Sequence, residues 1–285
     1  MTVLDIGRLT GEVADHEAAV AAQIGSPARL GVAFSGGVDS SVLLALAVRA
    51  LGPGRTLAIL GVSPSLAQDE RTNAHAVAAH IGAPLVEVVT DEGDNPAYRA
   101  NGPDRCFHCK DVLFTRISDD IAEQFGVTAV AYGENADDAL RPDRPGSCAA
   151  TRHAVMRPLA AAGLTKNHVR SIARALELPS ADKPAAPCLA SRIPHHQEVT
   201  PEKLGQVDRA ESGLRLLGFA DSRVRHHGDV ARVELPQDDL VRAVSPEVRR
   251  EVLRVVTDAG FRFVALDLAG IQSGAFTLPL VTRRG

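Results

Sequence analysis

Three cysteines and one glycine-rich run stand out by residue type and spacing. Cys106 and Cys109 form a Cys-x-x-Cys pair, and Cys188 lies much further along the chain. Ahead of all three stands the run Ser35-Gly36-Gly37-Val38-Asp39-Ser40-Ser41. Thiolates hold soft metals, and a glycine-rich turn before a helix holds phosphate groups. Together they predict an enzyme that activates its substrate with ATP and then delivers a nucleophile, sulfur, from a metal-bound site.

The glycine-rich run lies between a predicted strand, residues 30–34, and a predicted helix, residues 40–50. Gly36 and Gly37 let backbone N–H groups converge on phosphate oxygens, and the start of the helix adds partial positive charge. The run ends without the lysine of a Walker A loop. The alternative interpretation is a plain turn between a strand and a helix.

The side chains of the run add hydroxyl donors and one carboxylate. The hydroxyl groups of Ser35, Ser40 and Ser41 can donate to the same phosphate oxygens. Asp39 is suited to help hold a Mg²⁺ ion, because a metal is the usual way to neutralise a leaving pyrophosphate. We therefore predict ATP and Mg²⁺ as the ligands of this run.

The cysteine spacing allows several kinds of site. Cys106 and Cys109, three residues apart at a predicted helix start, point to one face, and Cys188 would complete a three-thiolate site. Three thiolates can hold a 4Fe-4S cluster with one iron left open. A structural zinc ion would need a fourth ligand, which His108 or Cys148 offers. Separate buried cysteines are the third alternative, and Cys148 in particular is expected to be packed.

The order of predicted elements indicates a doubly wound α/β fold with a mostly parallel sheet. Predicted strands cover residues 30–34, 56–62, 84–89 and 128–132, and predicted helices cover 40–50, 67–81, 106–125 and 166–176. Gly133 begins a polar turn at the carboxyl end of a strand, where open α/β sheets bind ligands. Cys188 belongs to a proline-rich loop, residues 179–194, and long loops of this kind carry function.

The last third of the chain has a different pattern. Two helix starts, Thr200-Pro201-Glu202 and Ser245-Pro246-Glu247, each combine a capping hydroxyl, a proline and an acid. Between them, predicted strands 223–227 and 231–235 turn at Gly228-Asp229, and a last strand covers 261–268. We predict a domain of residues 1–197 that includes the cysteine loop, and a smaller α+β domain of residues 198–285 for substrate binding and oligomerisation.

The composition sets limits on the class of protein. The 285 residues are 45% hydrophobic and 23% charged, with a formal net charge of −4. An acidic chain with two tyrosines and no tryptophan is poorly suited to bind nucleic acid. Proline, glycine or charge interrupts every apolar stretch before membrane-spanning length. We expect a cytoplasmic protein, in which thiols stay reduced.

The glycine-rich run resembles the PP-loop of the ATP pyrophosphatase superfamily, whose members cleave ATP between the α- and β-phosphates to adenylylate a substrate. Further motifs, in order, resemble the LarE family of ATP-dependent sulfur transferases. They are Arg105-Cys106-Phe107-His108-Cys109-Lys110, Gly133-Glu134-Asn135-Ala136-Asp137-Asp138, Arg144-Pro145-Gly146, Pro158-Leu159, Gly163-Leu164-Thr165-Lys166, Lys183-Pro184, Cys188-Leu189-Ala190-Ser191-Arg192, Arg223-Val224-Arg225 and His227-Gly228.

The resemblance implies a substrate and a sulfur source. The substrate would be pyridinium-3,5-biscarboxylic acid mononucleotide, whose carboxylates become thiocarboxylates on the way to the nickel-pincer nucleotide cofactor of lactate racemase. Some members of the family have a lone cysteine at the position of Cys188 that gives up its own sulfur. This chain has three cysteines, which favours the form in which Cys106, Cys109 and Cys188 bind a 4Fe-4S cluster carrying sulfide.

Other residues and partners complete the prediction. Ser191 and Arg192 follow Cys188 directly and are candidates to orient the substrate carboxylate, since arginine suits bidentate contact. The resemblance makes Arg223 and Arg225 a phosphate clamp for the nucleotide substrate, and it implies a homo-oligomer, with a sulfide donor protein as a candidate partner. The competing functions are a tRNA 2-thiolation enzyme with the same loop and a zinc-stabilised module that binds nucleotide without chemistry.

Overall fold

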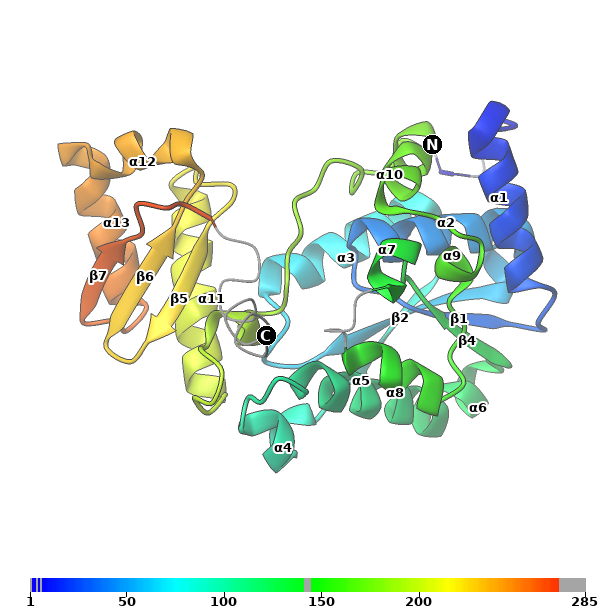
Figure 1. Cartoon of the computed structure of the whole chain (residues 1–285), viewed down its shortest axis with the longest axis horizontal. Coiled ribbons are helices and arrows are strands. Elements are labelled where there is room, and N and C mark those ends of the chain that lie inside the picture. Colours follow the sequence, from blue (N-terminus) through cyan, green and yellow to red (C-terminus); the bar gives the residue numbers. More distant parts are fainter. Residues whose placement is uncertain (1, 4, 6, 141–144, 272–285) are drawn as a thin grey trace. The chain divides into compact units, whose positions relative to one another are not determined.

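A computed structural model describes residues 2, 3, 5, 7–140 and 145–271 of the chain. These residues form two compact units (Figure 1). The first unit consists of residues 1–63, 70–92 and 106–186, and the second consists of residues 64–69, 93–105 and 187–285, within the described ranges. The predicted boundary between residues 197 and 198 stays a prediction about folding domains.

A four-stranded parallel sheet in the order β3-β2-β1-β4 forms the centre of the first unit. Its strands are β1 (Leu30–Ala33), β2 (Thr56–Val62), β3 (Leu85–Val89) and β4 (Ala129–Tyr132). All strands run parallel because a helix returns the chain between successive strands. The predicted doubly wound α/β fold is confirmed.

Helices cover both faces of this sheet, as Figure 1 shows. Contacts join α1 (Gly11–Ile24), α2 (Val38–Leu51) and α10 (Lys166–Ala175) on one face, where α3 (Gln68–Ile81) also lies. The helix α2 is buried along most of its length, because its apolar residues surround it on nearly every side. On the other face Phe114 and Ile117 pack into a core with Leu57 and Ile59 of β2.

The helix predicted over residues 106–125 is confirmed in its extent, but it is not one regular α-helix. The segment consists of α5 (Arg105–Arg116), a π-helical turn η3 (Ile117–Ile121) and α6 (Ala122–Phe125). Ile117 and Ile121 are both buried in the wider turn. An apolar stripe at residues 113, 117 and 121 fits a regular helix equally well, so the sequence pattern does not mark the π turn. The remaining helices of this unit are short: α7 (Ala136–Ala139), α8 (Pro145–Arg152) and α9 (Pro158–Ala161).

The second unit contains a three-stranded sheet in the order β5-β6-β7. Strands β5 (Arg223–His227) and β6 (Val230–Glu234) form the predicted hairpin at Gly228-Asp229, and β7 (Phe263–Leu266) runs parallel to β6. Helices α11 (Pro201–Leu216) and α13 (Pro246–Asp258) contact each other and the sheet. The short elements α4 (Pro96–Arg99) and η4 (Leu189–Arg192) also belong to this unit.

The predicted α-β-β-α-β order of this unit lacks one helix, α12 (Gln237–Val244). It begins after Pro236, and Asp238 and Asp239 lie in its first turn, where negative charge stabilises a helix. Among the described residues, no helix is both long and apolar enough to span a membrane. Arg144 of the predicted motifs lies outside the described residues.

Candidate functional site

The glycine-rich run and the polar turn after β4 meet at the carboxyl ends of neighbouring strands. The chain passes from β1 outward to β2 and β3, and then returns to place β4 on the other side of β1. This reversal of strand order is where open α/β sheets bind their ligands. Residues 35–37 follow β1 and Gly133 follows β4, so the fold brings both predicted segments to that point.

Two glycines are required by close contacts at this point. Gly36 has a φ of 71°, and a Cβ there would lie 2.9 Å from Cα of Ala74. A Cβ on Gly133 would lie 2.6 Å from the backbone nitrogen of Ser40. Only glycine therefore allows the end of β4 to approach the first turn of α2 this closely.

The first turn of α2 is arranged to receive an anion. Its N-cap is Gly37, and no side chain of the described residues caps this end. Ser40 Oγ donates to the Gly37 carbonyl oxygen at 3.0 Å and accepts from the backbone N–H of Ser35 at 3.3 Å, which fixes the loop. Ser41 Oγ is buried and has no hydrogen-bond partner among the described residues. An uncapped helix start with hydroxyl groups beside it is a phosphate-binding arrangement.

Asp39 has two partners that the sequence analysis did not assign to the site. Asn135 donates from Nδ2 to Asp39 Oδ1 at 2.9 Å, and Lys166 Nζ forms an ion pair with Asp39 Oδ2. Asn135 is the N-cap of α7, and Lys166 is the first residue of α10. Both residues belong to the motifs that resemble the LarE family, and this resemblance is the sequence signal that could have assigned them to the site.

A cavity of about 240 Å³ opens beside the glycine-rich run. Ser35, Asp39 and Ser40 line it together with apolar residues and with Lys110, Tyr132 and Glu134. Lys110 Nζ lies 4.1 Å from the centroid of the Tyr132 ring. Burial raises the pKa of Tyr132, so its hydroxyl group stays protonated at neutral pH. The cavity thus places a lysine and a carboxylate beside the phosphate-binding loop.

The predicted metal ligands are divided between the two units. Cys106 and Cys109 lie in the first turns of α5 in the first unit, with Cys106 exposed and Cys109 half-buried. Cys188 is exposed and is the N-cap of η4 in the second unit. Cys148 is exposed in α8, so the expectation that it is packed is wrong. The helix α8 buries Gly146, Ala149 and Ala150 instead, so small size alone does not place Cys148 in the core.

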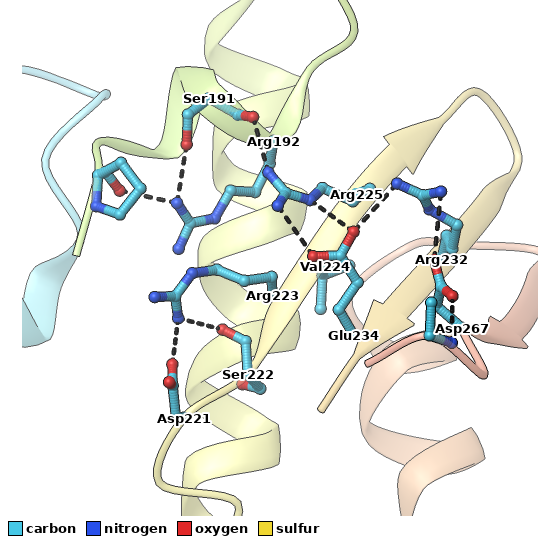
Figure 2. A network of polar contacts seen from close by, with 12 residues as sticks. Ser191, Arg192, Asp221, Ser222, Arg223, Val224, Arg225, Arg232, Glu234 and Asp267 are labelled. Atoms are coloured by element: carbon cyan, nitrogen blue, oxygen red, sulfur yellow. Dashed lines mark hydrogen bonds and ion pairs between the residues drawn. The ribbon is translucent and has the colours of Figure 1, made fainter. Parts of the chain in front are cut away.

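The turn after Cys188 is held by two buried arginines, which Figure 2 shows. Arg192 donates from Nη1 to the carbonyl oxygen of Pro187 and to Ser191 Oγ, both at 2.8 Å. Arg225 donates from Nη1 to the carbonyl oxygen of Ser191 at 3.1 Å. Of the predicted site residues, Ser191 is therefore in contact with both Arg192 and Arg225. Their contacts fix the backbone on both sides of Cys188.

Each of these arginines is paired with a buried carboxylate. Arg192 Nε lies 2.8 Å from Glu211 Oε1, and both side chains are less than 5% exposed. Arg225 Nη2 lies 2.8 Å from Glu234 Oε2, and Glu234 also accepts from Arg232 Nη2 at 3.0 Å. Losing one partner of such a buried pair would leave an uncompensated charge, so each pairing is costly to break.

Arg223 lies on the same strand, two residues before Arg225, and has different partners. Its Nη1 forms an ion pair with Asp221 and donates to the carbonyl oxygen of Ser222 at 2.9 Å (Figure 2). The side chain of Arg223 is 11% exposed. Arg223 and Arg225 are thus both paired with carboxylates and little exposed, and their predicted role as a phosphate clamp stays a prediction.

Comparisons with known proteins agree with this geometry. A family model described as asparagine synthase matches residues 16–250. The pyridinium-3,5-bisthiocarboxylic acid mononucleotide synthase of Lactiplantibacillus plantarum is 34% identical over 266 residues, which cover 92% of this chain and 94% of that protein.

Two uncharacterised proteins are also similar. One from Synechocystis sp. is 42% identical over 243 residues, which cover 85% of this chain and 90% of that protein. One from Methanocaldococcus jannaschii is 28% identical over 237 residues, 83% of this chain and 88% of that protein. The match to the family model spans residues of both units and the phosphate-binding loop. The chain therefore belongs to the LarE family of PP-loop sulfur transferases and is an ATP-dependent sulfur-transferring enzyme.

Proposed function

We propose that this enzyme converts the carboxylates of pyridinium-3,5-biscarboxylic acid mononucleotide to thiocarboxylates, a step toward the nickel-pincer nucleotide cofactor. One observation carries the proposal: the 34% identity to a synthase of the bisthiocarboxylic acid mononucleotide extends over 92% of the chain. A match of this extent covers the phosphate-binding loop, the cysteines and the arginine network together. The cytoplasmic location, the homo-oligomer and the sulfide donor protein stay predictions.

Activation of the substrate would take place at the phosphate-binding loop. A carboxylate oxygen of the substrate attacks the α-phosphorus of ATP, a phosphoanhydride bond breaks, and pyrophosphate leaves. The residues Ser35, Gly36, Gly37, Asp39, Ser40, Ser41 and Gly133 would surround the phosphates, with Asp39 as a ligand of Mg²⁺. The uncapped start of α2 supports this role, since its amide groups and partial positive charge stabilise a leaving polyanion.

Transfer of sulfur would follow from the acyl-adenylate. A hydrosulfide nucleophile attacks the acyl carbon, a C–S bond forms, the C–O bond to phosphate breaks, and AMP leaves. Arg192 and Arg225 would fix the Cys188 turn through the carbonyl oxygens of Pro187 and Ser191. Ser191 keeps its hydroxyl group half-buried beside that turn and would orient the substrate carboxylate together with Arg192.

The three cysteines fit the donor set of a 4Fe-4S cluster. Cys106 and Cys188 have exposed side chains, and Cys109 lies one helical turn after Cys106 on the same helix. Thiolates in this number leave one iron without a protein ligand. When bound, the cluster would hold sulfide in a deprotonated form at neutral pH, so that the chain is not consumed.

Arg223 and Arg225 would bind the phosphate group of the nucleotide substrate. The two guanidinium groups belong to alternate residues of β5 and therefore to one face of the strand. The Arg225 side chain is 6% exposed and contacts Glu234 and the Ser191 carbonyl oxygen, whereas the Arg223 side chain is 11% exposed. Arg223 is thus the better placed of the two for a direct phosphate contact.

Mass spectrometry of the small-molecule product tests the proposal. The protein, purified without oxygen, is incubated with ATP, Mg²⁺, sulfide and the dicarboxylic mononucleotide. We expect pyrophosphate release and a product in which sulfur replaces carboxylate oxygen. Asp39→Asn should abolish both, whereas Arg71→Met, which breaks a surface ion pair of the same unit, should leave both intact. Pyrophosphate release stimulated by tRNA but not by the mononucleotide would overturn the proposal.

A further inference from the structure

Two histidines and a glutamate from different helices of the first unit lie together outside the phosphate-binding loop. Glu12 and His16 lie one turn apart on α1, and His168 lies in the first turn of α10. Glu12 Oε1 is 3.9 Å from His16 Nε2 and 3.8 Å from His168 Nε2. The three ligand atoms all lie within 4.8 Å of one another.

The spacing of these atoms does not match direct hydrogen bonds. Charge-assisted N–H···O bonds are about 2.8 Å long, so both distances to Glu12 are too long for them. A tetrahedral zinc site with bonds of about 2.0–2.1 Å places neighbouring ligand atoms roughly 3.4 Å apart. The rings of His16 and His168 are 4.3 Å apart at 30°, which lets both Nε2 atoms face the same carboxylate. The arrangement is therefore closer to that of three ligands around one ion.

We infer that Glu12, His16 and His168 form a binding site for a zinc-type divalent cation. Two imidazole nitrogens and one carboxylate are a donor set that Zn²⁺ takes, with water completing four ligands. The Glu12 side chain is 76% exposed, whereas His16 and His168 are 18% and 35% exposed. Glu12 can therefore move about half an ångström toward an ion without disturbing the packing of either helix.

One contact opposes the ion and limits its affinity. The backbone N–H of Thr165 donates to His168 Nδ1 at 3.4 Å, as part of the capping box of α10. A neutral imidazole that binds an ion through Nε2 carries its proton on Nδ1, so Nδ1 no longer accepts a hydrogen bond. The backbone N–H of Thr165 must then donate to water instead. The bond is long and Thr165 is half-buried rather than buried, which keeps this cost small.

An ion at this position would fix the N-terminal helix to the nucleotide-binding fold. It would join α1 to the first turn of α10, two residues after Lys166. Lys166 is the residue whose Nζ pairs with Asp39 of the phosphate-binding loop. The ion would thus stabilise the segment that positions this lysine. The inference does not depend on the proposed substrate or on the sulfur source.

Calorimetric titration with Zn²⁺ alone tests the site. The full-length protein is used with all four cysteines replaced by serine, because thiolates would otherwise bind the same ion. This four-serine protein is the parent of every variant described below. We expect one equivalent of Zn²⁺ to bind and to raise the melting temperature. His16→Gln and His168→Gln should each weaken binding by more than tenfold, since even the loss of a supporting contact costs about 10-fold to 100-fold.

Two further variants decide the outcome. Glu12→Gln leaves an exposed side chain of the same shape and should weaken binding without changing the stability of the metal-free protein. His80→Gln, in α3 of the same unit, is the matched control and should bind as the parent does. Absence of Zn²⁺ binding to the parent would overturn the inference. An equal loss in His80→Gln would overturn it as well.

Discussion

Lys166 Nζ forms an ion pair with Asp39 Oδ2 across 127 residues of sequence. Asp39 lies in the first turn of α2, and Lys166 is the first residue of α10. The pair places a cation beside the loop that would receive the phosphates of ATP. A Walker A loop carries its lysine within the loop, whereas here a distant helix supplies the cation.

Replacing Lys166 by methionine should slow pyrophosphate release on the order of 100-fold, the usual effect of removing one electrostatic contact to a transition state. The Asp39 carboxylate would lose its cation next to the anionic phosphates. Initial rates of pyrophosphate release at saturating ATP measure the effect, and Lys166→Arg should restore part of the rate. Equal rates in Lys166→Met and Arg71→Met would show that the ion pair has no role in activation.

Replacing Gly133 by alanine should disturb the phosphate-binding loop. The new Cβ would lie 2.6 Å from Ser40 N and 2.7 Å from Asp39 C, both backbone atoms that cannot move aside cheaply. We expect a loss of about 1–3 kcal/mol in the free energy of unfolding and weaker ATP binding. Urea denaturation and nucleotide titration measure the two effects. Gly54→Ala, whose Cβ would meet nothing within 4 Å, should be neutral.

The sequence predicts local elements well and distant pairings poorly. The strands 56–62 and 223–227 are confirmed without change. An apolar run marks the first strand locally, and the turn Gly228-Asp229 marks the hairpin that contains the second. No local pattern marks the π turn at Ile117–Ile121 or the pairing of Lys166 with Asp39. The pairing depends on how α10 packs beside α2, which only the complete fold decides.

The arginines of the second unit show the same limit. Alternation along residues 223–225 predicts that two arginines share a face of a strand, but it does not reveal their partners. Arg225 pairs with Glu234 of β6, and Arg192 pairs with Glu211 of α11, so each of these two pairings depends on tertiary structure. Residue type identifies the arginines as candidates, and the hydrogen bonds of Arg192 and Arg225 show that these two also hold the Cys188 turn.

Replacing Arg192 by methionine should destabilise the second unit by about 3–5 kcal/mol, because Glu211 would remain charged, buried and unpaired. Urea denaturation measures this loss, and the alkylation rate of Cys188 should rise as its turn loosens. The control is Arg254→Met, which removes an exposed pair with Glu251 and should cost at most about 1 kcal/mol. A loss no larger than that of the control would contradict a buried, ionised pair.

The pH dependence of stability should contain a contribution from Glu87. Hydrogen bonds from Arg71 and His75 lower the pKa of Glu87 from 4.5 to about 2. A lowered pKa in the folded state stabilises the protein above the unfolded value, and this stability is lost as the pH falls from about 4.5 to 2. Solvent screening at this partly exposed site limits the contribution to about 1 kcal/mol. Glu87→Gln should flatten the slope of unfolding free energy between these pH values.

Replacement of single cysteines should separate a cluster from a sacrificial sulfur donor. If Cys106, Cys109 and Cys188 share a cluster, serine at any of the three should lower the iron content and the yield together, because each thiolate is a ligand. Wild-type protein should then release many product molecules and keep its mass.

If Cys188 alone donates sulfur, Cys106→Ser should keep full yield, and the wild-type chain should lose the mass of the transferred sulfur. Iron assays, product counts and intact-protein mass spectrometry on the same samples distinguish the two mechanisms. Cys148→Ser is the matched control, since this exposed cysteine lies outside the proposed ligand set.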